Sequence, residues 1–444
     1  MRPASLLLAL ALPLQGLAAQ QAPPVTAIRA GVLIDGTGAA PVRNAIILVQ
    51  GERITAVGPG LAIPKGAKVV DLSGETVLPG FIDAHVHLIG RIIGDGDWQH
   101  SAVTELPSAM TLLGAAHAQQ TLEAGFTTVR IVGAPGFADL GLRDAIDAGW
   151  VPGPRILGAG IALGARGGHC DETAGFNPGT FGHEAGFQDG VADGVDQARS
   201  AVRYMVKYGA DLIKICATGG VLSPKDSVGL QQYTEEEMRA IVETAAMLRR
   251  KVAAHAHGTE GIKAAVRAGV ASIEHGSMLD DEAVQLMKQH GTYLVPTLLA
   301  AFTVESLATA HQLPPAIAAK ALAIAPRIHD SFKRAVDAGV KIALGTDAGV
   351  MQHGTNAREF ALMVKYGMSP MQAIQAGTLN GATLLGREAE VGSLERGKLA
   401  DLVAVKGDPL RDIGVLQQVD FVMKGGAVFK QNGRVEGRSD AAVR

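Results

Sequence analysis

The chain is poor in cysteine, aromatic residues and net charge, and each shortage excludes a class of protein. Two of its 444 residues are cysteine, too few for the disulfide framework of a small secreted domain or for a four-cysteine zinc site. Aromatic residues make up 4%, so no stacking platform for single-stranded nucleic acid is visible. The formal net charge is -3 at pH 7 and no long basic run occurs. We therefore expect no nucleic-acid partner.

Uninterrupted apolar runs of membrane-spanning length are also missing. The first 20 residues combine Arg2, an apolar stretch over 5–14 and small residues over 16–19, the pattern of a cleaved export signal. That stretch is shorter than the ~20 residues that a spanning helix needs. We predict a signal peptide at 1–20 and a mature protein, free of the membrane, that is periplasmic or secreted. A buried N-terminal helix is the alternative interpretation.

The remaining composition favours a large folded core. Hydrophobic residues make up 47% and charged residues 19%, with a mean hydropathy of +0.19, which argues against disorder. Short β-rich runs between glycine, aspartate and proline occur near both chain ends, such as 45–49 and 402–405, and fit strands of a small sheet. We predict that 24–78 and 388–436 together form one composite β-sandwich domain.

The middle of the chain, 79–387, alternates strand-like segments with alanine-rich helical ones. The helical segment 234–250 begins with Thr234 followed by Glu237, which is a capping box. Strands alternating with helices are typical of a parallel barrel, so we predict the α/β class and a (β/α)8 TIM-like barrel. The expected strands are 80–88, 126–132, 155–163, 210–217, 251–256, 271–276, 292–297 and 340–346.

Metal-ligand side chains follow several of these apolar runs. His85 and His87 end the first run, and because residues i and i+2 of a strand share one face, both could bind a single ion. Active sites of such barrels lie at the C-terminal strand ends. Alternation places Glu274 on the outer face. Other ligand types at predicted strand ends are Lys214, His255, His275 and Asp347. The sequence therefore predicts a metal site at one rim, although a lone Asp347 would also fit a turn.

Lys214 stands inside an apolar run, where an unpaired ammonium is costly. One interpretation is a lysine paired with a carboxylate; the other, which the neighbouring ligands favour, is a lysine carbamylated by carbon dioxide to give a bridging anion. Cys170 and Cys216 also leave two options. An exported protein could pair them, but Cys216 shares a strand face with Lys214, which favours an unpaired cysteine that lines the barrel.

These segments resemble the metal-dependent amidohydrolase superfamily. The resemblance rests on Asp83-Ala84-His85-Val86-His87, Lys214, His255, His275, Gly345-Thr346-Asp347 and the segment 392–403, and it covers nearly the whole mature chain. Segments 254–258, 273–276 and 167–169 look like the imidazolonepropionase-related, prolidase-like branch, which contains Xaa-Pro and Xaa-Arg dipeptidases and ochratoxin-hydrolysing amidohydrolases.

The resemblance implies two divalent metal ions. It assigns His85, His87 and Asp347 to one ion and His255 and His275 to the other, with carbamylated Lys214 as bridging ligand and Asp347 as the catalytic proton carrier. Nitrogen and oxygen ligands suit zinc, and manganese or cobalt could substitute.

Contacts to substrate are less specific in the sequence. The resemblance points to Tyr233, which could equally be a packing residue, and His169, His257 and His353 lie near the expected mouth. A cation that binds a substrate carboxylate could be Arg166, Lys225 or Arg358.

We expect a binuclear amidohydrolase that cleaves amide or peptide bonds in dipeptides or N-acyl amino acids with a free carboxylate; ochratoxin A is such a compound. The resemblance also implies a homo-oligomer. One alternative is a mononuclear cyclic amidohydrolase or deaminase, imidazolonepropionase-like, which would not need Lys214. Another is a catalytically inactive scaffold with the same fold.

Overall fold

The computed structural model describes residues 23–96, 98, 100–223 and 226–436. The predicted signal peptide, 1–20, lies outside these residues. Within them, no helix combines the length and the apolar character needed to cross a membrane.

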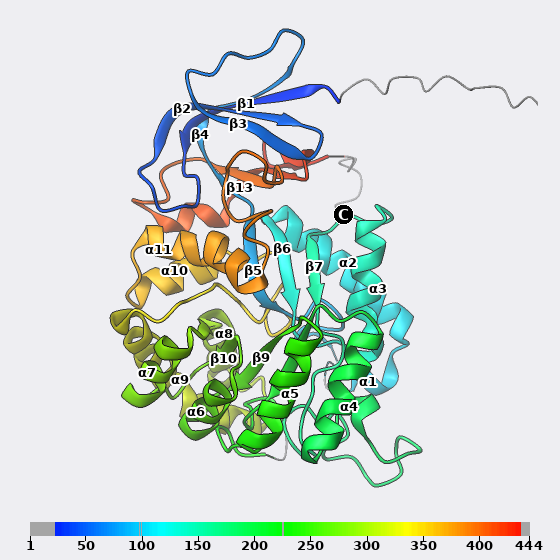
Figure 1. Ribbon diagram of the computed structural model, residues 1–444. Helices are drawn as coiled ribbons and strands as arrows, with labels where there is room; N and C mark the ends of the chain where they lie inside the picture. Colours follow the sequence, from blue (N-terminus) through cyan, green and yellow to red (C-terminus); the bar gives the residue numbers. More distant parts are fainter. Residues whose placement is uncertain (1–22, 97, 99, 224–225, 437–444) are drawn as a thin grey trace, which may run out of the picture.

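Strands from both chain ends form one eight-stranded sheet. Its order is β15-β14-β13-β12-β4-β1-β2-β3, and Figure 1 shows the N-terminal strands in blue above the orange C-terminal ones. β1 pairs with β4 in parallel, and the other neighbours are antiparallel. The strands are β1 (Val25–Leu33), β2 (Val42–Gln50), β3 (Arg53–Pro59), β4 (Lys68–Pro79), β12 (Leu402–Val405), β13 (Val419–Lys424), β14 (Ala427–Gln431) and β15 (Arg434–Val435).

Seven parallel strands form two further sheets that carry four of the predicted ligands, His85, Lys214, His255 and His275. One has the order β5-β6-β7 and the other β11-β10-β9-β8. A parallel bridge from Leu163 to Ile215 links the β7 side to β8. The strands are β5 (Phe81–Val86), β6 (Phe126–Ile131), β7 (Arg155–Gly158), β8 (Leu212–Cys216), β9 (Lys251–Ala256), β10 (Ser272–His275) and β11 (Tyr293–Val295).

The eighth predicted strand, 340–346, is not a regular strand. Ile342 makes an isolated parallel bridge to Leu294, and Ala348 makes another to Val86. The backbone N–H of Ala84 also donates to the Leu344 carbonyl at 2.8 Å. This segment therefore occupies the position between β11 and β5 that the prediction gave it, but it meets its neighbours through single contacts instead of a continuous ladder.

Helices follow the parallel strands and cover them on the outside (Figure 1). The capping box before α5 is present, since the Glu237 N–H donates to the Thr234 hydroxyl at 3.2 Å, and this helix ends at Met247 instead of 250. The helices are α1 (Ser101–Thr104), α2 (Pro107–Glu123), α3 (Ala138–Asp147), α4 (Gly194–Lys207), α5 (Glu235–Met247), α6 (Thr259–Ala268), α7 (Asp281–His290), α8 (Leu298–Thr309), α9 (Pro315–Ala338), α10 (Arg358–Lys365), α11 (Pro370–Gln375) and α12 (Gly381–Leu385).

A disulfide joins Cys170 to Cys216, with their Cα atoms 5.8 Å apart. The expectation that Cys216 stays unpaired is therefore wrong. Cys170 belongs to the long connection after β7, and the chain returns this connection to the end of β8, where Cys216 lies. Sequence spacing could not show this return because it depends on how the connection folds back.

Candidate metal centre

His85, His87 and Asp347 converge beyond the end of β5. The Asp347 Oδ1 atom lies 3.4 Å from Nε2 of His85 and 3.4 Å from Nε2 of His87. His85 is 1% exposed, whereas His87 is 37% exposed. One side of this group therefore faces the interior and the other opens outward.

His255, His257 and His275 form a second group beside the first. Ligand atoms of these three residues lie within 4.8 Å of one another, and the same holds for His85, His275 and Asp347. His275 belongs to both groups, so the two candidate ligand sets adjoin. The sequence predicted His255 and His275 as ligands and His257 as a substrate contact. The geometry also brings His257 within ligand distance of the other two, so its role stays a prediction.

Two left-handed backbone positions direct side chains into the site. His275 has φ 70° and Asp347 has φ 60°, a conformation that L-residues other than glycine seldom adopt. At His275 it interrupts strand alternation, and Glu274 is fully buried and bonded to His85. The prediction that Glu274 faces outward is therefore wrong, because alternation holds only while the backbone stays extended.

Four imidazoles of this cluster contact a neighbouring oxygen through Nδ1. Nδ1 of His85 contacts Glu274 at 2.8 Å, and Nδ1 of His87 contacts the Gly133 carbonyl at 3.1 Å. Nδ1 of His257 contacts the Ser277 hydroxyl, and Nδ1 of His275 contacts the Thr297 hydroxyl, each at 2.7 Å. Such contacts orient metal-binding imidazoles and leave Nε2 as the ligand atom.

Burial keeps the imidazoles of His255, His257 and His275 neutral, which is the form that binds metal. It lowers the pKa of His257 to about 3, and burial together with neighbouring imidazoles lowers the pKa values of His255 and His275 well below the ordinary range. Nε2 of His255 is buried and has no hydrogen-bond partner among the described residues. Neutral nitrogen donors, an unpartnered buried nitrogen and a carboxylate fit a divalent cation.

Lys214 lies in the middle of β8 and is 4% exposed. Burial lowers the pKa of its amine to about 8, although Glu274 and Asp347 favour the charged form. Burial acts to raise the pKa of Asp347, but the nearby His85, His87 and Lys214 outweigh it, so the pKa falls below its ordinary value. Asp347 is therefore ionised at neutral pH, as a ligand must be.

Residues 76–429 match the model of the amidohydrolase family. The chain belongs to this family. As an amidohydrolase it is a hydrolase of carbon–nitrogen bonds, and the resemblance stated from the sequence is confirmed. Enzymes of this family act on small molecules.

Three relatives illustrate the range of similarity. Ochratoxinase from Aspergillus niger is 36% identical over 430 residues, which cover 92% of this chain and 87% of that protein. The crystal structure of a Xaa-Pro dipeptidase with bound methionine in its active site has a TM-score of 0.88 at 42% identity, covering 91% of this chain and all of that one. Imidazolonepropionase from Cutibacterium acnes is 28% identical over 382 residues, which cover 82% and 84% of the two chains.

A buried polar network around Asp83 lies next to the candidate ligands His85 and Asp347. The Asp83 carboxylate accepts bonds from the Thr346 hydroxyl at 2.6 Å and from Nδ2 of Asn356 at 2.8 Å. It also accepts the backbone N–H of His85 at 3.1 Å. Asp83 thus joins the end of β5 to the segment that carries Asp347.

His169, a predicted substrate contact, reaches the cluster from the connection after β7. Its ring stacks on His255 with centroids 4.2 Å apart, and its Nδ1 lies 2.9 Å from the Ser223 hydroxyl. A Cβ atom at Gly220 would lie 2.3 Å from the His169 ring, so only glycine leaves room for it there.

Two other predicted contacts are packed inside the protein. Tyr233 is 1% exposed, and its hydroxyl has no hydrogen-bond partner among the described residues. His353 is 7% exposed and stacks on His117 with centroids 4.1 Å apart. Neither belongs to the two ligand groups.

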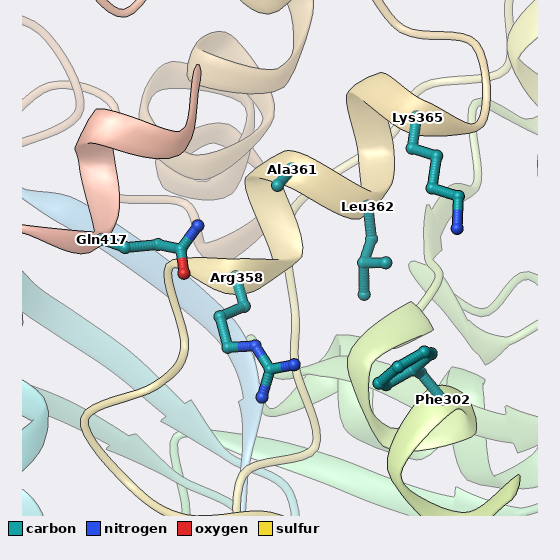
Figure 2. A pocket seen from close by; sticks show the side chains of 6 residues that line it. All are labelled: Phe302, Arg358, Ala361, Leu362, Lys365 and Gln417. Atoms are coloured by element: carbon teal, nitrogen blue, oxygen red, sulfur yellow. The ribbon is translucent and has the colours of Figure 1, made fainter. Parts of the chain in front are cut away.

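The three basic residues predicted as candidates to bind a substrate carboxylate lie in different surroundings. Arg166 is held by Asp193 and Glu184 within its own connection, and Lys225 lies outside the described residues. Figure 2 shows Arg358 beside Phe302 in a surface pocket of about 250 Å³, and its guanidinium carbon lies 5.9 Å from the ring centroid. None of the six predicted metal ligands lines that pocket.

The sequence interpretation missed Arg130, which lies in β6 and is 4% exposed. Its sequence signal was the same as that of Lys214, because each is a basic residue within an otherwise apolar strand segment.

Proposed function

We propose that this amidohydrolase is a binuclear metal enzyme that cleaves the amide bond of dipeptides or N-acyl amino acids with a free carboxylate. The observation that carries the proposal is the pair of adjoining ligand groups that share His275. We interpret the two parallel sheets and the segment 340–348 as a (β/α)8 barrel, with the ligands at its C-terminal rim.

In this proposal His85, His87 and Asp347 would hold one ion, and His255 and His275 the other. Carbamylation of Lys214 would replace a buried cation by an anion that bridges both ions. When bound, two divalent cations, of which zinc fits these ligands best, lower the pKa of attacking water toward ~7 and polarise the scissile carbonyl.

Asp347 is the proposed proton carrier. Its carboxylate accepts a proton from the attacking water as the water oxygen bonds to the carbonyl carbon. As the carbon–nitrogen bond breaks, Asp347 delivers that proton to the leaving nitrogen, and the products are a carboxylic acid and an amine.

The substrate class is supported by the names of two relatives, an ochratoxinase and a Xaa-Pro dipeptidase. Both names point to compounds with an amide bond. We further propose that the protein is exported, consistent with its predicted signal peptide and its disulfide, and that it forms a homo-oligomer.

A substrate screen tests the proposal. Purified, zinc-loaded protein is assayed against N-acyl amino acids, dipeptides of varied C-terminal residue and ochratoxin A, with metal content measured in parallel. We expect cleavage of at least one compound with a free carboxylate and two ions per chain. Turnover of a cyclic imide or lactone alone would refute the substrate class.

The imidazolonepropionase relative supports the mononuclear alternative. Full activity of Lys214→Ala with one ion per chain would favour that alternative. A wild-type protein that binds no metal would instead favour the inactive scaffold.

A further inference from the structure

The Glu274 carboxylate contacts three different strands from a fully buried position. Its Oε2 atom lies 2.8 Å from Nδ1 of His85 in β5, and its Oε1 atom lies 2.8 Å from Nη2 of Arg130 in β6. Oε1 also accepts the hydroxyl of Ser272, in its own strand, at 2.5 Å. The carboxylate therefore has three hydrogen-bond partners, one of them a candidate metal ligand.

Arg130 holds this carboxylate from below the ligands. Its Nε donates to the Ala84 carbonyl at 2.5 Å and its Nη1 lies 3.1 Å from the Ser272 hydroxyl. The Arg130 guanidinium and the Ser272 hydroxyl both donate to Oε1 of Glu274, and a buried carboxylate paired with a guanidinium is held in its ionised form. An ionised carboxylate can only accept hydrogen bonds.

This acceptor decides which nitrogen of His85 carries the proton. Because Glu274 accepts at Nδ1, that nitrogen bears the hydrogen and Nε2 keeps its lone pair. Nε2 is the atom that lies 3.4 Å from Asp347 Oδ1. Nδ1 of His87 contacts a backbone carbonyl, and Nδ1 of His257 and of His275 each contact a hydroxyl. His85 differs from these three in having an anionic partner.

We propose that Glu274, anchored by Arg130, is a positioning residue that fixes His85 as its Nδ1–H tautomer and strengthens His85 as a metal ligand. The inference deepens the proposed function, since it rests on metal binding at that site. A carboxylate behind a ligating imidazole raises its basicity, and loss of such a partner typically weakens metal affinity by about 10–100-fold.

The first test measures zinc affinity by chelator competition, without substrate. Glu274→Gln keeps the size of the side chain and removes its charge, and we expect zinc dissociation constants about 10–100-fold higher. Asp139→Asn is the matched control, because Asp139 is a fully buried carboxylate that accepts the Gly160 N–H at 2.8 Å and belongs to neither ligand group. This control should keep the wild-type affinity.

The thermal midpoint of both metal-free variants separates positioning from general stability. A Glu274→Gln protein with a lower midpoint and unchanged zinc affinity would overturn the proposal, because the ion pair would then be only structural. A loss of affinity beyond that of Asp139→Asn at a comparable midpoint supports it.

A second measurement needs no substitution at Glu274. It therefore tests the proposal even in the case that Glu274→Gln does not fold. Long-range proton–nitrogen spectra of metal-free wild-type protein report imidazole tautomers, and the His85 signals are assigned by their loss in His85→Asn. We expect the Nδ1–H form; an Nε2–H form would overturn the proposal. Because neither test uses a substrate, failure to find a cleaved amide would count against the proposed function alone.

Discussion

Removal of the Cys170–Cys216 disulfide should destabilise the protein by an amount that its loop length sets. The two cysteines are 46 residues apart, and in the chain-entropy model a closed loop of this size corresponds to about 4 kcal/mol at 25 °C. The measured effect of a disulfide on the free energy of unfolding is often smaller than this model value. We therefore expect the Cys170→Ser/Cys216→Ser double variant to be about 2–4 kcal/mol less stable than the wild type.

The same crosslink holds the connection that carries His169 against the end of β8. His169 lies in that connection and stacks on His255. We therefore expect the double variant to lose a larger fraction of its hydrolytic activity than of its bound zinc. Urea unfolding followed by circular dichroism gives the stability change, and amide hydrolysis with metal analysis gives the functional one.

Reduction of the wild-type protein provides the control. A phosphine reductant should shift the wild-type urea midpoint toward that of the double variant and leave the double variant unchanged. An identical midpoint for oxidised wild type and double variant would refute the reasoning, since the crosslink would then not constrain the unfolded chain.

Three other predictions address the site and its surroundings. Asp347→Asn should lower kcat for amide hydrolysis by about 10²–10⁴-fold, the usual contribution of a positioned acid–base group; a smaller loss at equal metal content would exclude Asp347 as the proton carrier. Arg130→Met should lower the free energy of unfolding by about 3–5 kcal/mol, because it leaves Glu274 charged and unpaired inside the protein; a neutral effect in urea unfolding would contradict this. Burial raises the pKa of Asp139 from 3.8 to about 6, so the folded state holds this proton more tightly than the unfolded state. The contribution of Asp139 to stability is therefore greatest below about pH 4 and declines as pH rises to about 6; the wild-type urea midpoint minus that of Asp139→Asn should be larger at pH 4 than at pH 7, and an equal difference would exclude the shift.

Several features of the site were predictable because they depend on near neighbours in the chain. The spacing of His85 and His87 puts both on one strand face, and the structure brings both to Asp347. The capping box at Thr234 is equally local and is present. His255 and His275 were found in a similar way, because each ends an apolar run that was predicted to be a strand.

Other features were missed because the local rules stop applying. Alternation counted back from His275 put Glu274 on the outer face, but the left-handed backbone at His275 breaks the alternation at that residue. Glu274 therefore lies inside, where it contacts His85. The predicted strand 340–346 makes isolated bridges, since Leu344 shares its backbone groups between Ala84 and Ala376.

The sequence by itself determined the family, the α/β alternation and which side chain types end which strands, because each depends on residue identity over a few positions. Only the tertiary structure decided that Glu274 and Arg130 meet behind His85, that Cys170 reaches Cys216, and that His257 joins the ligand groups. These are contacts between segments far apart in the chain. The polar ones form because a buried charge or polar atom is costly unless another group of the protein replaces its contacts with water.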